Sequence, residues 1–562
     1  MNSYLSRINR VLQVLLFTYL LTLLISLSQI LLAAQEGRKL LDEIRTGVAS
    51  QQNIEVYADR LDSTATTLGS PILALPAFLI GERESFSKLS EIGQYLSGAL
   101  YNLSPIVNRT MDEIDISDSI TIQRDAQLLL RADTDIRNLL LRLKDFKFTE
   151  IFKSQNKRII RYRVTITRYE DLYARVSPLL PIIPDIVGNS TPRRYFVGIQ
   201  NSAQARGTGG FAGVYADITF QRGKLTINKV APLGELRDLP EIPIKVPQEF
   251  RDIYLDYPKS FGWANLSPHF PYGAAIWEKG YRANTGLQVD GVLAVDVFLM
   301  RALLAATGPV FLDEVLITSD NIVEQVLSKA YVEYRDDPIK RKNYLADIAE
   351  EVADRFAKGN YSRRVLLENL IDPILEDRIL FYSTYPREQR YLSLSPIGGV
   401  LDDQPNNEYR LVIQNIAGNK MDYYLERRVS ILSERCTPIR TTRVDFSIKN
   451  TASASPLLPP YVNSIVEQGY PSGFNNAHYV GIFLYGPTNA KLTGVIDNDT
   501  GKTYGWVFTE RKRPLYSVQV MIPAGSQKNF SAYFEGGVGE ISNKTQPLVI
   551  PQITQIVDSC KG

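Results

Sequence analysis

The sequence predicts an α+β protein of several domains: an N-terminal transmembrane helix, a helical stalk, a domain of mixed strands and helices, and a C-terminal β-sandwich. Three observations predict this arrangement. Residues 11–34 form one uncharged run. Apolar residues recur at spacings of three and four over residues 35–175, and short alternating segments separated by turns follow residue 408. The chain of 562 residues is long enough for three or four domains.

The composition argues against several classes of function. Lys and Arg total 63 against 61 Asp and Glu, for a net charge of +2, whereas a nucleic-acid binder usually shows a basic surplus. Two Cys and two His exclude a Cys₄ zinc site, and these four residues lack zinc-finger spacing. Catalysis by histidine is poorly supported, because His269 and His478 fall in different predicted domains and no Gly-x-Ser-x-Gly turn is present.

The uncharged run at residues 11–34 is long enough to cross the ~30 Å hydrocarbon core of a bilayer as a helix. Arg7 and Arg10 precede it, which predicts a cytoplasmic N-terminus. We therefore expect residues 1–34 to be a tail and single-pass anchor in the cell membrane, with the bulk of the chain extracytoplasmic. A cleaved signal peptide is the alternative.

Residues 35–185 are expected to form a helical membrane-proximal stalk or bundle. Pro71, Pro76 and Pro105 should break it into pieces, because proline removes a backbone donor and disfavours the helix interior. A proline-rich stretch at residues 177–184 marks its end.

An α/β domain is predicted over residues 190–400, because strand patterns there are interleaved with helical ones. The strands are expected at residues 195–200, 213–220, 225–230 and 289–295. The helices are expected at residues 298–306, before Gly308 and Pro309, and over residues 321–380.

Residues 408–562 read as strands without helices, at the short, regular spacing typical of an immunoglobulin-like β-sandwich. The expected strands are 409–414, 423–432, 442–449, 479–485, 491–497, 504–509, 516–522 and 529–535. Cys436 and Cys560 both fall in this domain, where they are either a disulfide or two free thiols.

The most unusual local sequence is Asn-Ser-Ala-Gln-Ala-Arg-Gly-Thr-Gly-Gly-Phe at residues 201–211. Gly207, Gly209 and Gly210 permit positive φ angles and close backbone approach, and Arg206 precedes them. Exposed amides in such a turn can form a nest for a phosphate. The alternative is a tight connection between strands with a surface arginine. It is not a Walker loop, because no Gly-Lys-Ser/Thr ending follows.

Further candidates lie in the same domain. Arg237 and Asp238 follow the predicted hairpin, and Asp290 lies in the predicted buried strand with Asp296 after it. Since an unpaired buried charge is costly, an aspartate there indicates a function or a structural pairing with Arg282 or Arg301.

Several ordered motifs resemble the bacterial family called domain of unknown function 4012, over about residues 190–540. They are residues 201–211, Trp-Ala-Asn at 263–265, Phe-Pro-Tyr-Gly-Ala-Ala at 270–275, 289–296, 303–310, Asn-Lys-Met-Asp-Tyr at 419–423 and Pro-Ala-Gly at 523–525. That family often has an acid two residues before the arginine of the Gly-rich turn, whereas this chain has Gln204.

The family in turn looks distantly similar to the LytR–CpsA–Psr proteins, which are membrane-anchored transferases of glycopolymers from polyprenyl-pyrophosphate lipids to the cell wall. This resemblance implies a central domain like the core of those proteins and a set of site residues. The implied catalytic residues are Arg206, Arg237 and Asp238; the implied substrate-binding residues are Gly207, Gly209, Gly210, Arg282 and Arg301; the implied ligands of a Mg²⁺ ion are Asp238 and Asp290.

Two hypotheses follow, and a third stays open. The first is an envelope phosphotransferase, or a binder of polyprenyl-pyrophosphate lipid, whose partners are the bacterial membrane and a cell-wall polymer. The second is a non-enzymatic envelope scaffold or adhesion-type protein. A secreted hydrolase is the third, since carboxylate pairs meet only in three dimensions. Convergence of Arg206, Arg237 and either Arg282 or Arg301 on one pocket would favour the first; their dispersal would favour the second. The sequence does not predict an oligomeric state.

Overall fold

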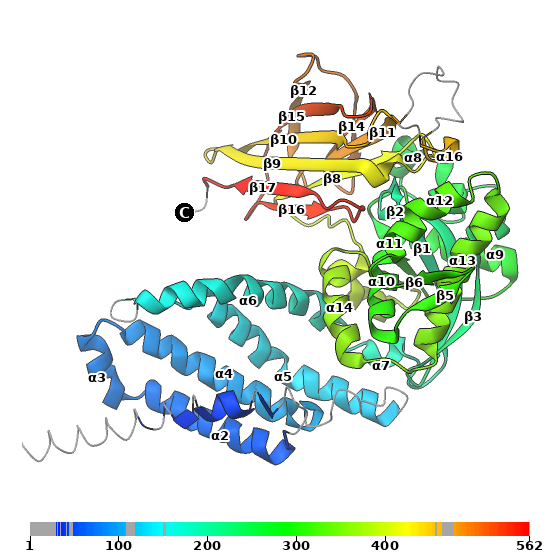
Figure 1. The fold of residues 1–562 in the computed structure, drawn as a ribbon. Coiled ribbons are helices and arrows are strands. Elements are labelled where there is room, and N and C mark those ends of the chain that lie inside the picture. The colour runs from blue at the N-terminus through cyan, green and yellow to red at the C-terminus, as the bar shows by residue number, and fades with distance from the viewer. Residues whose placement is uncertain are drawn as a thin grey trace, which may run out of the picture. The chain divides into compact units, whose positions relative to one another are not determined.

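The computed structural model describes residues 49–107, 119–149, 153–455, 458–463 and 476–560, together with residues 28, 30, 32, 33, 35–40, 42 and 43. The chain divides into two compact units, residues 1–190 and 191–562 (Figure 1). We call them unit 1 and unit 2 and describe each by itself.

Unit 1 is helical in its described part, as the spacing of apolar residues predicts. Its helices are α2 (Gln51–Leu68), α3 (Pro71–Leu79), α4 (Arg83–Val107), α5 (Ser119–Asp145), α6 (Asn156–Val176) and the short α7 (Ile183–Ile186), coloured blue to cyan in Figure 1. Pro71 begins α3, where a missing N–H costs nothing. Pro76 and Pro105, by contrast, lie inside α3 and α4 and do not end them.

The expected transmembrane helix requires a correction. Most of residues 11–34 lie outside the described part of the chain. Among the helices that the structure describes, none combines the length and the apolar character that crossing a bilayer requires. The long helices carry charges, such as the Arg137–Asp133 pair one turn apart on α5. The structure therefore supports neither the transmembrane helix nor the single-pass location in the cell membrane.

Unit 2 contains a five-stranded mixed sheet in the order β3-β2-β1-β4-β7. β1 pairs in parallel with β4, and every other neighbouring pair is antiparallel. The bounds are β1 (Arg193–Arg206), β2 (Gly209–Gln221), β3 (Lys224–Pro232), β4 (Gly291–Asp296) and β7 (Leu380–Ser383). The first four were expected from the sequence, whereas β7 was not, and it begins where the expected helical stretch of residues 321–380 ends.

Helices cover both faces of this sheet, because its strands carry apolar residues on both sides. On one face, Phe196 and Tyr215 pack with Trp277 of α9 (Phe270–Thr285). On the other face, Val214 packs with Met300 of α10 (Val297–Thr307) and with residues of α13 (Pro338–Ala357). The remaining elements are α8 (Gln248–Tyr254), the hairpin β5 (Val310–Leu312) and β6 (Val315–Ile317), α11 (Ile322–Glu324), α12 (Ala330–Glu333), α14 (Arg363–Leu375) and α15 (Pro386–Ser393).

The C-terminal strands form two five-stranded sheets that enclose one apolar core, coloured yellow to red in Figure 1. One sheet has the order β12-β15-β10-β9-β17 and the other β13-β14-β11-β8-β16. The bounds are β8 (Glu408–Asn415), β9 (Leu425–Arg435), β10 (Thr441–Asn450), β11 (His478–Tyr485), β12 (Lys491–Asp497), β13 (Trp506–Glu510), β14 (Arg513–Ile522), β15 (Gln527–Glu535), β16 (Ser542–Thr545) and β17 (Ile553–Val557). The molecule is thus α+β with several sheets, as the sequence predicts.

Two strands of the sandwich, β16 and β17, are absent from the sequence prediction. Each pairs in parallel with a strand from early in the domain, β16 with β8 and β17 with β9. Directly after β17, Cys560 forms a disulfide with Cys436, 124 residues earlier, which resolves the choice between a disulfide and free thiols in this structure.

A buried carboxyl group joins the mixed sheet's domain to the sandwich within unit 2. Glu510, at the end of β13, accepts hydrogen bonds from the hydroxyls of Ser267 (2.6 Å), Tyr254 (2.9 Å) and Tyr485 (2.6 Å). Burial raises the pKa of Glu510, and the three hydroxyls oppose that shift. Since Tyr254 belongs to α8 and Tyr485 to β11, the network fixes the two parts of unit 2 to each other.

Candidate functional site

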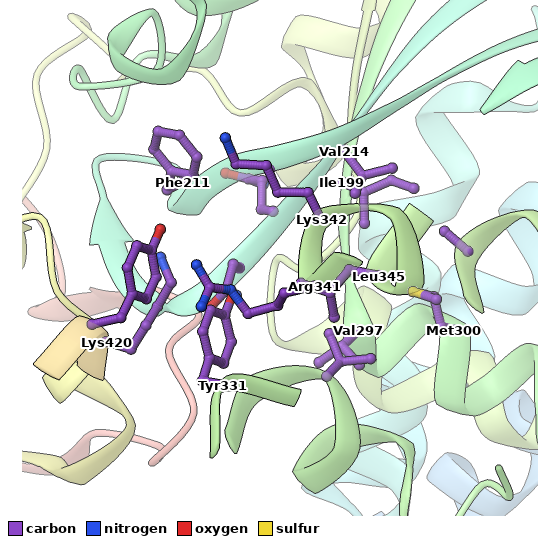
Figure 2. A pocket seen from close by; sticks show the side chains of 16 residues that line it. Ile199, Phe211, Val214, Val297, Met300, Tyr331, Arg341, Lys342, Leu345 and Lys420 are labelled. Atoms are coloured by element: carbon purple, nitrogen blue, oxygen red, sulfur yellow. The ribbon is translucent and has the colours of Figure 1, made fainter. Parts of the chain in front are cut away.

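A cavity of about 90 Å³ lies between β1, β2, α10 and α13 on one side and residues 420 and 461 on the other. Sixteen residues line it (Figure 2). Three of them are cations, Arg341, Lys342 and Lys420. None of the described residues that line it is an acid. We call it the Arg341 cavity.

The wall of the Arg341 cavity has two distinct parts. Figure 2 shows Lys420, Phe211, Tyr331, Arg341 and Lys342 toward one side. Aliphatic side chains occupy the other side: Ile199, Val214, Val297, Met300 and Leu345. The cavity therefore offers positive charge at one end and an apolar surface at the other.

The start of α13 places Arg341 in this wall. Asp337 caps the helix by accepting from the backbone N–H of Lys340, and Pro338 occupies the first helical position. Residues 341, 345 and 349 then recur at intervals of four, so they share the face of α13 that lines the cavity.

Arg341 is a buried cation with unused hydrogen-bonding capacity. Arg341 is only 1% exposed, and its guanidinium carbon lies 3.9 Å from the ring centroid of Tyr461. Nη1 makes a long 3.4 Å contact with the carbonyl of Tyr334, while Nη2 finds no hydrogen-bond partner among the described residues. A buried donor without a partner is costly, and an anionic ligand would satisfy it.

Lys420 is the second buried cation of the cavity, at 3% exposure. Burial, and to a smaller extent the positive charges of Arg206 and Arg341, lower its pKa to about 7, against the opposing effect of Asp422. Nζ also lies 5.5–5.7 Å from the ring centroids of Phe211, Tyr331 and Tyr461. At a desolvated site such contacts stabilise an ammonium by ~2 kcal/mol or more, so they offset only part of the cost of burying the charge.

An irregularity in β1 brings a neutral partner to Lys420. The pairing of β1 with β2 shifts register between residues 201 and 205, so the intervening residues bulge from the ladder. Gln204 lies in this bulge, and its Oε1 accepts a hydrogen bond from Lys420 Nζ. The amine thus donates to an amide at the position where an acid is frequent in the family that the sequence resembles.

The structure places Arg206 in the core of unit 2, outside the lining of the Arg341 cavity. Nη1 donates to the carbonyls of Ala205 and Asn415, both at 2.8 Å, and the guanidinium carbon lies 4.2 Å from the ring centroid of Trp263. Burial lowers its pKa to about 10, against the effect of Asp422. Arg206 is therefore buried, and not the surface arginine of a strand connection.

The Gly-rich turn is a hairpin in which β1 ends at Arg206 and β2 begins at Gly209. A Cβ on Gly207 would lie 2.0 Å from the carbonyl oxygen of Leu266, and one on Gly210 would lie 2.2 Å from that of Asn201. Gly209 has a φ of +137°, which a side chain would oppose. Close packing therefore explains these glycines without a bound anion.

The other sequence-predicted arginines do not join Arg206. Arg237, Arg282 and Arg301 are all exposed, and none of them lines the Arg341 cavity. The backbone of Arg237 bonds to the side chain of Asn284, and Arg301 lies over the ring of Phe298 at 4.9 Å.

The predicted magnesium ligands do not fit a shared metal site. Asp238 is exposed and accepts from the backbone N–H of Phe261. Asp290 accepts from the backbone N–H of Arg194 and from the hydroxyl of Tyr385, both at 2.7 Å, so both of its oxygens already have protein donors. Among the described residues, no group of three or more His, Cys, Asp or Glu side chains could hold a metal ion.

The structural pairings expected for the aspartates also differ. Asp290 lies 3.8 Å from Arg193, and Asp296 pairs with Arg378 at 2.6 Å, so neither Arg282 nor Arg301 is the partner. The two histidines are buried outside the cavity: His269 Nδ1 accepts from the backbone N–H of Leu401, and His478 lies 3.3 Å from Asp422.

With this geometry in place, comparison with known proteins gives one result. Residues 190–331 match the family described as Protein of unknown function (DUF4012). The match supports the DUF4012 resemblance over a shorter range than the expected 190–540 and does not bear on the LytR–CpsA–Psr proteins. No curated protein and no solved structure matches the chain.

The DUF4012 match includes the walls that β1 and β2 give to the Arg341 cavity, and it ends at Tyr331. Arg341 and Lys420 lie beyond it, and the sequence analysis singled out neither residue. Lys420 belongs to the quoted 419–423 motif, which was the available signal. Arg341 lies in the basic run Lys-Arg-Lys at residues 340–342, a pattern that usually marks a solvated helix face.

Proposed function

We propose that unit 2 binds an amphiphilic phosphate ester in the Arg341 cavity, and specifically the diphosphate of a polyprenyl-linked glycopolymer precursor. The observation that carries the proposal is the division of the cavity wall into a cationic part and an aliphatic part. A diphosphate with a prenyl chain has the complementary division of charge and apolar surface.

The cationic part suits a phosphate group. Guanidinium groups pair with phosphate oxygens through parallel N–H donors, and Arg341 Nη2 has no other described partner. Lys342 adds positive charge, and Lys420 adds it in its protonated form, with no acid among the described lining residues to neutralise either. The aliphatic part, which includes Val297 and Met300, would bury the first prenyl unit.

Transfer of a glycopolymer from such a lipid, the activity of the LytR–CpsA–Psr proteins, is the reaction class in which this ligand would take part. A non-enzymatic interaction protein is the second candidate. It is favoured by the dispersal of Arg237, Arg282 and Arg301 over the exposed surface and by the burial of Arg206.

The test is calorimetric titration of the full chain with geranyl diphosphate and, separately, with inorganic diphosphate. We expect geranyl diphosphate to bind more tightly, because only it has an apolar chain. Arg341→Gln should weaken binding of both by about tenfold to a hundredfold, since a hydrogen bond to a charged group contributes ~1.5–3 kcal/mol.

Two variants act as controls for this experiment. Arg301→Gln removes an exposed arginine on α10 and should leave both affinities unchanged. Val297→Thr keeps the shape of the cavity wall but makes it polar. It should weaken the binding of geranyl diphosphate and leave the binding of inorganic diphosphate unchanged. Absence of binding by the wild-type chain, or equal weakening by Arg341→Gln and Arg301→Gln, would leave the interaction protein as the better hypothesis.

A further inference from the structure

Lys420 has a chemistry that the binding of a phosphate leaves unused. Its amine lines a cavity, is almost completely buried, and donates to a neutral amide oxygen of Gln204. Among the described residues, no carboxylate lies within ion-pair distance of Nζ. Lysine becomes a nucleophile when it loses its proton, which burial and neighbouring cations promote.

The charges that face Lys420 come from several elements. Arg206 of β1 and Arg341 of α13 disfavour its protonated form, whereas Asp422, two residues along the chain, favours it. Tyr331 of α12 and Tyr461 present ring faces to the amine. Asp422 Oδ2 accepts from the backbone N–H of Ala205 and from Asn415, and Oδ1 lies 3.3 Å from His478 Nδ1. With a pKa of about 7, a large share of the amine is neutral at physiological pH.

We propose that Lys420 captures an anionic carbonyl compound, an aldehyde or ketone that carries a carboxylate or phosphate group, as an imine in the Arg341 cavity. The proposal rests on the proposed function for one step, the binding of the anionic group by Arg341 and Lys342. The cavity places these two cations and the amine around the same space (Figure 2).

The chemistry of the capture is balanced without a further reagent. The Nζ lone pair attacks the carbonyl carbon, a C–N bond forms, and the carbonyl electron pair moves to oxygen. A proton passes from nitrogen to that oxygen and gives a carbinolamine. Loss of one water molecule then leaves the C=N bond of the imine, and hydrolysis by water reverses the sequence.

The experiment uses the full chain, cyanoborohydride and two small aldehydes of matched size. Glyoxylate is anionic and glycolaldehyde is uncharged, and cyanoborohydride traps either imine as a stable alkyl-lysine. Peptide mapping by mass spectrometry then gives the labelling rate of each lysine at pH 7. We expect glyoxylate to label Lys420 on the order of a hundredfold faster than the exposed lysines, which are almost wholly protonated at this pH.

Gln204→Glu is the decisive variant, because it changes the partner of the amine while keeping its size. A carboxylate at position 204 raises the pKa of Lys420, so labelling at pH 7 should slow about tenfold for each unit of that rise. The midpoint of the pH–rate profile should move up with it. Lys342→Met removes an exposed cation of the same cavity. It should slow the labelling of Lys420 by glyoxylate without moving the midpoint of the pH–rate profile.

The outcomes separate this inference from the proposed function. Selective labelling of Lys420 by both aldehydes at equal rates would support the reactive amine and contradict the anion site. Labelling spread evenly over the lysines would overturn the inference, whatever the affinity for geranyl diphosphate. An unchanged pH midpoint in Gln204→Glu would also overturn it. The wild-type mapping does not depend on the folding of any variant.

Discussion

Arg378 Nη1 donates a 2.6 Å hydrogen bond to Asp296 Oδ2, and both side chains are almost completely buried. The same guanidinium donates from Nη2 to the carbonyl of Leu548 and lies 3.7 Å from the ring centroid of Phe298. Asp296 also caps α10 through the backbone N–H of Phe298. This one pair therefore connects the end of β4, the start of α10 and the C-terminal segment.

Removal of Asp296 should be strongly destabilising. Asp296→Ala leaves the buried Arg378 charge with only the more exposed carboxylate of Glu376 as an ion-pair partner, so the free energy of unfolding should fall by about 3 kcal/mol, the lower end of the cost of breaking a buried pair. Urea unfolding followed by circular dichroism measures this. Glu368→Ala, which breaks the exposed pair with Arg364, is the matched control and should cost no more than ~0.5 kcal/mol. Equal losses in the two variants would contradict the assignment.

Lys420 should make stability depend on pH in a defined window. Its pKa is about 7 in the folded chain and 10.5 when unperturbed, so the unfolded chain binds the extra proton between these values. The free energy of unfolding therefore rises with pH across that window, and the cost of Lys420 is complete below pH 7.

The measurement is the stability difference between Lys420→Met and the wild-type chain as a function of pH. At pH 6–7 we expect the free energy of unfolding of the variant to exceed that of the wild-type chain by on the order of a few kcal/mol, because each unit of pKa shift corresponds to ~1.4 kcal/mol. The gain should fade toward pH 10. A difference that stays constant across the window would show that the amine is protonated in the folded chain.

Removal of the Glu510 carboxyl group should destabilise unit 2. Glu510→Ala leaves Ser267, Tyr254 and Tyr485 without their shared acceptor, at a cost of roughly 1–3 kcal/mol for each hydroxyl that finds no other partner. Chemical denaturation monitors the loss, and Glu241→Ala at an exposed position is the control. A loss below ~1 kcal/mol would mean that the hydroxyls are re-satisfied by each other or by water.

The disulfide should stabilise unit 2 by restricting its unfolded state. It closes a loop of 124 residues, and removal of such a bond typically costs ~2–5 kcal/mol. The double variant Cys436→Ser/Cys560→Ser should therefore unfold at lower denaturant concentration, and the wild-type chain should approach it under reducing conditions. Free alkylation of both cysteines without a reductant would contradict the pairing.

Much of the fold was predictable because its strands and helices follow simple periodicities. The hairpin of β2 and β3, the strand-to-helix passage from β4 to α10, and eight strands of the sandwich match expected segments. β16 and β17 were missed for a physical reason. They are edge strands whose pairing partners lie far away in the sequence, and β17 is exposed along its length, so neither shows an alternation of buried and exposed residues.

The candidate site was less predictable, because burial and charge neighbours exist only in three dimensions. Arg206 has the sequence context of a ligand-binding arginine, yet its guanidinium meets two carbonyls and an indole. Lys420 and Arg341 are separated by 78 intervening residues in the sequence and share one cavity through the packing of α13 against β1 and β2. No local sequence pattern indicates that Lys420 and Arg341 line the same cavity.

The pairing of β16 with β8 and of β17 with β9 affects how the sandwich folds during synthesis. A ribosome makes β8 and β9 long before their outer partners, so both sheets of the nascent sandwich must wait with open edges. Open edges recruit strands from other chains. Residues 542–557 therefore cover one edge of each sheet, and until they are made β8 and β9 are open to pairing with strands of other chains.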